Sequence, residues 1–187
     1  MKEKEFMLGS GDLYICEKTA EKIPDNATIE TEANRFGYIQ GGATLSYKAE
    51  YINVKDDVGY INDQILKSED VTFKSGVLHR NMDVVPMLIE TARQEPDAAE
   101  GTVTTKIGGV KNINGKVYIL RFVHRSQVNP EYELRATMIG KNINGLELLM
   151  QSEKETVTDA LFSASPLDDA GTLIYLTEKA PAASEVR

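Results

Sequence analysis

The sequence predicts a mainly β protein: an antiparallel β-sandwich or barrel with one flanking α-helix and a long protruding hairpin loop. Three observations favour this fold. Apolar and polar residues alternate in about nine or ten short segments, which is the period of half-buried strands. Residues 84–94 have apolar residues at helical spacing instead. Residues 55–67 form a long polar stretch between two of the predicted strands.

The N-terminal part divides into an arm and a few short elements. Residues 1–11 end in Gly9-Ser10-Gly11 and are expected to be a flexible arm. Three elements precede the hairpin: a strand over residues 12–17, a short strand over residues 27–31 and a glycine-bounded connection over residues 34–42.

Residues 41–78 are expected to form the long hairpin. Apolar residues occupy every second position of its first strand, at Leu45, Tyr47, Ala49 and Tyr51. Val71 and Phe73 indicate the return strand, and the loop between the two strands is assigned to about residues 55–67. Hairpin loops usually contain about two to five residues, so this loop is long.

Acidic and apolar residues are mixed within this loop. Long loops with exposed apolar side chains on a β scaffold serve binding more often than catalysis. We therefore predict that the loop contacts another copy of the protein, in a neighbouring subunit or ring. The residues assigned to this interface are Asp56, Asp57, Val58, Gly59, Tyr60 and Ile61.

The predicted helix spans about residues 84–94. Asp83 is a favourable N-cap, and Pro86 falls in the first turn, where its missing N–H does no harm. One apolar stripe follows at i, i+3, i+4 and i+7, formed by Val85, Leu88, Ile89 and Ala92. Such a short helix is stable only when its stripe packs on a sheet.

The remainder of the chain is predicted to be β again. The sequence Lys-Asn-Ile-Asn-Gly occurs at residues 111–115 and at residues 141–145, and Asn-Gly between alternating segments is a strong hairpin signal. Ordinary turn chemistry explains the repeat, although duplication would also produce it. The predicted strands are residues 116–125, 132–143, 146–151, 155–164 and 172–177, and residues 180–187 are expected to be a disordered tail.

Length, charge and cysteine content limit the possible functions. A chain of 187 residues suits one domain, assigned to residues 12–179. The 21 basic and 29 acidic residues give a net charge of −8, which argues against a general nucleic-acid binder. A single cysteine, Cys16, excludes an internal disulfide and a cysteine-rich zinc site. No apolar run of signal or membrane-spanning length is expected, and assembly in a cytoplasm is predicted.

The sequence predicts no catalytic residue, no cofactor and no metal site. The two histidines, His79 and His124, lie in no recognisable motif. The acidic pairs Asp56-Asp57 and Asp168-Asp169 lack the ligand spacing of a calcium loop, and solvated turn acids are the better interpretation. Three arginines on the predicted strands, Arg121, Arg125 and Arg135, are expected to pair with Glu131 and Glu133.

With its elements in this order, the chain resembles the major tail tube proteins of tailed bacteriophages, whose superfamily includes the tube of the type six secretion system. The shared order is an early strand pair with a long protruding loop, one helix and then a meander. The C-terminal passage also resembles the closing strands of such proteins: residues 155–164 end in Phe162-Ser163-Ala164, and an Asp/Gly turn follows at residues 168–171.

The resemblance implies a structural, non-enzymatic virion protein. Such subunits assemble into stacked rings, usually hexameric, that form the tail tube through which viral DNA passes without being specifically bound. It implies assembly in the bacterial cytoplasm and contacts with further copies of itself, the tape measure protein, the terminator and the baseplate initiator. It implies no membrane partner.

Two other functions remain open from the sequence. The first is a monomeric β-sandwich that binds carbohydrate or decorates a capsid, although a chain without tryptophan has little material for an aromatic platform. The second is a small hydrolase that uses Cys16 or a serine together with His124.

Overall fold

The computed structural model describes residues 11–55, 62–78, 84–127, 129, 131–147 and 157–179. Its strands are β1 (Gly11–Glu17), β2 (Arg35–Lys55), β3 (Asn62–Leu78), β4 (Arg93–Asp97), β5 (Thr102–Lys106), β6 (Tyr118–Arg125), β7 (Glu133–Asn142), β8 (Val157–Ser165) and β9 (Tyr175–Lys179). Its helical turns are α1 (Asn26–Ile29), η1 (Glu32–Asn34), α2 (Val85–Leu88) and η2 (Val110–Asn112).

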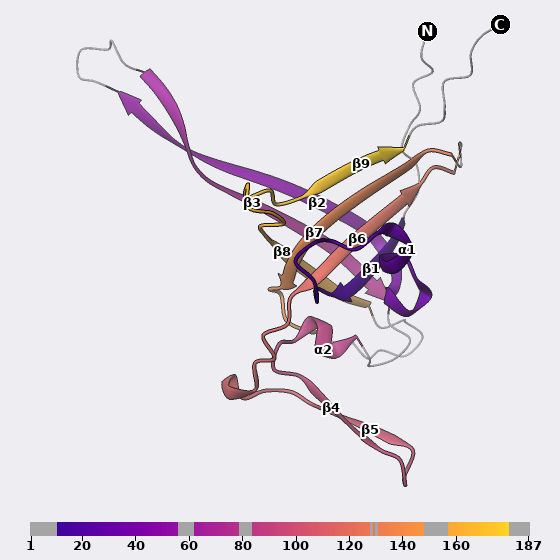
Figure 1. Cartoon of the computed structure of the whole chain (residues 1–187). Helices are drawn as coiled ribbons and strands as arrows, with labels where there is room; N and C mark the ends of the chain where they lie inside the picture. The colour runs from indigo at the N-terminus through magenta and orange to yellow at the C-terminus, as the bar shows by residue number, and fades with distance from the viewer. Residues whose placement is uncertain are drawn as a thin grey trace, which may run out of the picture.

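Seven strands form one antiparallel sheet in the order β6-β1-β2-β3-β8-β7-β9, and β6 also pairs with β7. Because β6 pairs with both β1 and β7, the sheet curls over and its two halves face each other (Figure 1). The join between β1 and β2 is short, with the two register pairs Leu13–Gly37 and Tyr14–Arg35. The predicted mainly β, antiparallel sandwich architecture is confirmed.

The main core fills the inside of the curled sheet. Phe36 of β2 and Phe162 of β8 meet edge to face, with ring centroids 6.0 Å apart, so the two halves of the sheet interlock. α2 adds Leu88 to this core from outside the sheet. Its buried residues are Leu13, Ile15, Phe36, Phe73, Leu88, Tyr118, Leu120, Met138, Ala160 and Phe162.

A second, smaller core lies on the other face of β1, β6 and β7. Along β1, Leu13 and Ile15 point into the main core, so Tyr14 between them faces this second cluster. Ile29 of α1 is fully buried there. The cluster consists of Tyr14, Ile29, Ile119, Val123, Ile139 and Leu167. β1 and β6 are therefore apolar on both faces and form the most enclosed part of the fold.

The helix is shorter than predicted. α2 contains four residues, with Pro86 in its first turn, and its N-cap is Val84 without a side-chain hydrogen bond, while Asp83 lies outside the described residues. The backbone becomes extended at Ile89, and Arg93–Asp97 form β4 instead of a third helical turn. Hydrogen bonding to β5 overrides a helix propensity that is a weak determinant over so few residues. Three of the four predicted stripe residues, Val85, Leu88 and Ala92, are nevertheless buried.

Two N-terminal predictions were also wrong. Residues 27–31 do not form a strand, because the Asp25 side chain accepts a hydrogen bond from the Thr28 backbone N–H at 2.9 Å and caps α1. The expected connection over residues 34–42 is strand for most of its length, since β2 begins at Arg35. Gly37 pairs with Leu13 in this strand and therefore does not mark a loop.

The C-terminal meander is largely as predicted. β6 and β7 pair antiparallel from Tyr118–Gly140 to Arg125–Glu133. β8 ends one residue beyond the range expected for its strand, at Ser165, and β9 begins later than expected, at Tyr175. Neither Asn-Gly sequence closes a two-residue hairpin, although Gly115 and Gly145 have the positive φ values, 65° and 70°, that such turns require. Leu146 and Glu147 are not in a strand, and residues 148–151 of that prediction lie outside the described residues.

Candidate assembly surface

β2 and β3 continue well beyond the body of the protein. β8 pairs with Thr72–Leu78 of β3, whereas β2 and β3 pair with each other as far as Lys55 and Asn62. From Ser46 and Thr72 to that last pair, nine residue steps of a strand correspond to about 30 Å. Figure 1 shows this ribbon projecting from the sheet. We call residues 45–55 and 62–71 the β2–β3 arm.

The arm replaces much of the predicted loop. Residues 62–67, expected to be loop, are the first part of β3. The six residues assigned to the interface, Asp56, Asp57, Val58, Gly59, Tyr60 and Ile61, lie outside the described residues, between the two strand ends. Sequence periodicity could not find this extension, because a ribbon with solvent on both faces has no requirement for alternation.

A β-bulge at Lys67 sets which side chains share a face of the arm. Glu50 pairs with Ser68 and Tyr51 pairs with Leu66, so Lys67 is the extra residue. Its ammonium lies 3.4 Å from Glu50 Oε2, which also accepts a hydrogen bond from Ser68 Oγ at 3.2 Å. The bulge moves Leu66 onto the face that carries Val71 and places Ile65 on the opposite face.

Both faces of the arm expose large apolar side chains. One face carries Tyr47, Tyr51 and Leu66, which are 59%, 57% and 45% exposed. We call this the tyrosine face. The other face carries Ile52, Val54 and Ile65, which are 49%, 39% and 53% exposed. We call this the isoleucine face.

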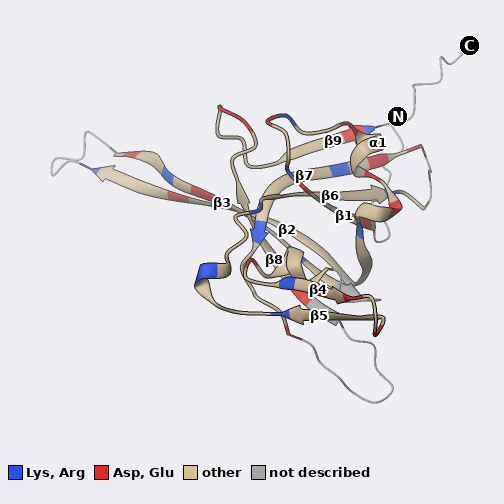
Figure 2. Ribbon diagram, turned by 60° about the horizontal axis from the view of Figure 1, so that its bottom comes forward, with Lys and Arg blue, Asp and Glu red and all other residues tan. Residues whose placement is uncertain are grey.

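Polar and charged residues lie beside the apolar residues of the arm. Tyr47 donates a hydrogen bond from its hydroxyl to Glu69 Oε2 at 3.0 Å, and this bond raises the pKa of Tyr47. Figure 2 shows charged residues of both signs along the two strands. Tyr47 is therefore fixed on the ribbon while most of its ring remains exposed.

An exposed ribbon of this kind gains stability when it is covered. A two-stranded hairpin is marginally stable at best in water. Covering the exposed halves of six large apolar side chains contributes on the order of 6 kcal/mol before the costs of association. The arm is therefore suited to binding a protein surface, on both faces.

The three arginines of the meander, Arg121, Arg125 and Arg135, form ion pairs with carboxylates of the fold. Glu30, next to α1, accepts hydrogen bonds from Arg135 Nε at 2.7 Å and Arg121 Nη1 at 3.0 Å. Arg135 also pairs with Glu133 of its own strand at 2.7 Å. Arg125 pairs with Asp12 at 2.9 Å and, across from β6 to β7, with Glu133 at 3.4 Å. The prediction of cross-strand pairing was thus right for Arg125 with Glu133, but the other carboxylates come from Glu30 and Asp12 rather than Glu131.

The pKa values in this network follow from burial and pairing. Burial raises the pKa of Glu30, but hydrogen bonds and charges from Arg135 and Arg121 outweigh it and leave the pKa below its usual value. The hydrogen bonds that Arg135 donates to Glu30 raise the pKa of Arg135, whereas burial lowers that of Arg121. These guanidinium groups hold α1 against β6 and β7 and form no phosphate site.

Cys16 and His124 are not brought together. In the β1–β6 pairing, Gly11 faces His124 and Cys16 faces Ile119, so the two side chains are separated by five residue steps, or about 16 Å. Burial also raises the pKa of the Cys16 thiol, against a smaller opposite effect of Arg121, which disfavours the thiolate. The hypothesis of a catalytic pair formed by Cys16 and His124 is therefore wrong. His79 lies outside the described residues.

Asp168 is a turn residue, as its sequence context predicted. Its carboxylate accepts hydrogen bonds from the Tyr175 hydroxyl at 2.7 Å and from the backbone N–H groups of Thr172 and Ala170 at 3.0 Å each. These bonds, that from Tyr175 first, lower its pKa to about 2. Asp56 and Asp57 lie outside the described residues. Within the described ranges, no three His, Cys, Asp or Glu side chains are grouped to hold a metal ion.

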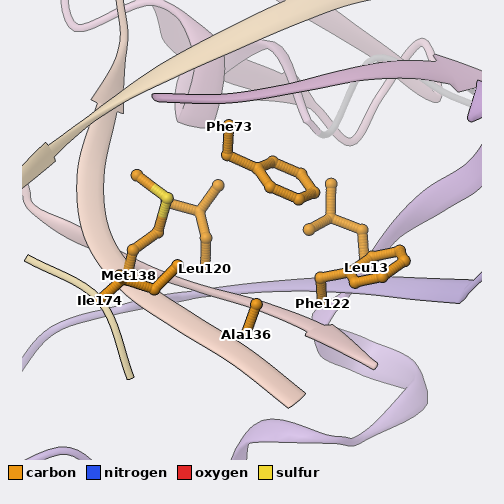
Figure 3. A pocket seen from close by; sticks show the side chains of 7 residues that line it. All are labelled: Leu13, Phe73, Leu120, Phe122, Ala136, Met138 and Ile174. Atoms are coloured by element: carbon orange, nitrogen blue, oxygen red, sulfur yellow. The ribbon is translucent and has the colours of Figure 1, made fainter. Parts of the chain in front are cut away.

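One end of the main core borders an apolar pocket without room for a water molecule. Figure 3 shows the side chains that converge on it from β1, β3, β6 and β7, together with the residue that precedes β9. They are Leu13, Phe73, Leu120, Phe122, Ala136, Met138 and Ile174. A pocket without polar groups offers nothing for catalysis, and we regard it as part of the packing beneath β9.

Among the helices that the structure describes, none is sufficiently long and apolar to cross a membrane. No protein-family model and no curated protein matches the chain. A solved chain from the virion of a native gene transfer agent particle aligns with 90% of this chain and 96% of its own length, with a TM-score of 0.42 and 10% sequence identity. A likeness at this level establishes neither a family nor a function.

Proposed function

We propose that this protein is a structural, non-enzymatic virion subunit that self-assembles into stacked rings forming a phage-type tail tube. The observation that carries the proposal is the β2–β3 arm, a ribbon about 30 Å long that exposes large apolar side chains on both faces. Such a ribbon is stabilised when neighbouring copies cover it. Six copies per ring is the number that the resemblance to tail tube proteins implies.

The electrostatics support a conduit for DNA better than a DNA-binding surface. The chain carries a net charge of −8, and Arg121, Arg125 and Arg135 are each paired with carboxylates. Unpaired basic groups along a channel would hold phosphates and slow the passage of DNA. The proposed site of action is the virion tail, assembled in the bacterial cytoplasm with the tape measure protein, the terminator and the baseplate initiator.

Negative-stain electron microscopy of the purified protein over a concentration series, paired with sedimentation, tests this function. We expect rings or hollow tubes with a regular axial repeat. The matched variant replaces residues 56–64 by a short Gly-Ser linker, and we expect it to fold but not to stack. If this variant polymerised normally, residues 56–64 would not belong to the interface. A monomer at every concentration, with or without an initiator complex, would favour the monomeric binding module instead.

A further inference from the structure

The β4–β5 ribbon carries apolar residues on one face beside the Gln94–Thr105 pair, and both of its faces are largely exposed. Among the described residues, β4 and β5 pair only with each other. Pro96 pairs with Val103 on one face, whereas the charged residues Arg93 and Lys106 pair on the other. Ile107 directly follows β5 and lies four residues after Val103, a spacing that places two strand residues on the same face.

Exposed aliphatic residues continue from this ribbon into the segment that follows it. Four of them occur within eleven residues: Val103, Ile107, Val110 and Ile113, which are 58%, 55%, 80% and 50% exposed. We call these four residues, together with Lys111, the β5–η2 surface. Exposed apolar residues usually occur singly, so four within eleven residues mark this segment as a candidate contact region.

The backbone that presents this surface is held in place. Asn112 donates a side-chain hydrogen bond to the Gly108 carbonyl at 2.9 Å. The backbone N–H of Asn114 donates to the backbone carbonyl of Glu90 at 3.0 Å. Gly108 and Gly109 have φ values of 109° and 84°, a left-handed turn that favours glycine. Val110 is therefore displayed by a defined turn rather than by a loose loop.

The charge of this surface is opposite to that of the arm. Residues 106–116 contain three lysines and no acidic residue, in a chain with a net charge of −8. The arm, residues 45–55 and 62–71, contains four acidic and three basic residues. Lys106 and Lys116 pair with Glu95 and Glu17, whereas Lys111 forms no ion pair with the described residues. Complementary charge of this kind steers association and suppresses wrong partners.

The two surfaces lie on different sides of the body. In Figure 1 the β2–β3 arm and the β4–β5 ribbon project in opposite directions, and Figure 2 also shows them apart. Two complementary surfaces at different places on one molecule produce head-to-tail association. We propose that the β5–η2 surface receives the β2–β3 arm of a second copy, an inference that rests on the proposed self-assembly.

Paired variants test this contact by sedimentation velocity. Ile52→Asp disables the arm, and Val110→Asp disables the receiving surface by adding a negative charge. We expect each substitution to weaken association at least tenfold. Assembly of the two variants should end at an oligomer of the same size. The matched control is Thr104→Asp on the polar, exposed face of β5, which should associate as the wild type does. Circular dichroism verifies folding, and Lys111→Glu is the substitute if Val110→Asp does not fold.

An equimolar mixture of Ile52→Asp and Val110→Asp distinguishes this contact from two separate ones. The intact arm of one variant fits the intact surface of the other. The mixture should therefore form an oligomer twice the size of the one that each variant forms alone. It should grow no further, because the remaining arm and the remaining surface are both disabled. If Val110→Asp and Lys111→Glu associate normally while Ile52→Asp does not, the arm binds elsewhere and only this inference fails. If the wild type itself never associates, the proposed function fails as well.

Discussion

Glu30, the C-terminal cap of α1, accepts a hydrogen bond from Arg135 of β7 at 2.7 Å across 105 residues of sequence. The same carboxylate holds Arg121 of β6 at 3.0 Å. Both charges of each pair are largely buried, with side-chain exposures of 10%, 13% and 6% for Glu30, Arg135 and Arg121. One carboxylate thus compensates two guanidinium groups beneath α1.

Replacing Glu30 leaves those two arginines without their shared partner. We expect Glu30→Gln to lower the free energy of unfolding by about 3 kcal/mol, because removal of one member of a buried ion pair leaves an uncompensated charge. Urea denaturation measures the change, and Glu131→Gln, at an exposed position, is the control with an expected change below about 0.5 kcal/mol. Equal effects of the two substitutions would contradict the role of Glu30.

The same network predicts an acid dependence of stability. Arg135 and Arg121 hold the pKa of Glu30 below its ordinary value of 4.5. A carboxyl whose pKa is depressed on folding contributes its stability above the unfolded value and loses it as the pH falls through the folded value. We expect the wild type to lose stability more steeply below about pH 4.5 than Glu30→Gln does. Parallel losses in unfolding experiments from pH 7 to pH 3 would exclude this contribution.

Gly140 is required by the close approach of β7 and β8. A Cβ at this position would lie 2.4 Å from the Ser163 carbonyl oxygen, which belongs to the backbone of β8. We expect Gly140→Ala to destabilise the fold by about 2 kcal/mol, because the strands must separate to admit the methyl group. Thermal unfolding measures this effect. An unchanged midpoint would show that the two strands move apart without cost.

Each face of the arm is expected to contribute to association. Tyr51→Ser on the tyrosine face and Ile52→Ser on the isoleucine face should each weaken self-association about tenfold, a loss of about 1.4 kcal/mol. Neither should change the stability of the fold beyond about 0.5 kcal/mol, since both side chains are largely exposed. Analytical ultracentrifugation measures association, with Asn53→Ser as the polar neighbour control. A loss on one face alone would restrict the contact to that face.

The sequence was most informative where strands are buried. β6 and β7 alternate or are continuously apolar because neighbouring layers cover them, and their boundaries could be predicted to within two residues. Residues 62–67 of β3 could not be assigned to a strand, because none of the described residues covers that part of the ribbon and its pattern is unconstrained. The contact between Glu30 and Arg135 was equally inaccessible, since no local pattern indicates a partner so distant in sequence.

The candidate site was located only in part. A contact arm between two strands was predicted from its length and its apolar residues, but the six residues assigned to it lie outside the described residues. The sequence places the apolar residues that the structure does describe in different elements, with Tyr51 in the first strand of the hairpin and Leu66 in its loop. The Lys67 bulge that distributes them over two faces leaves no mark in the sequence, because it depends on the register between β2 and β3.

Hydrogen–deuterium exchange of the arm tests the central claim most directly. Backbone amides of residues 45–55 and 62–71 are compared in dilute, unassembled protein and in the assembled form, with the buried strand β6 as the internal reference. If neighbouring copies cover the arm, its amides exchange rapidly when dilute and at least tenfold more slowly after assembly, while β6 is unchanged. Arm amides that exchange equally fast in both states would contradict assembly through this arm.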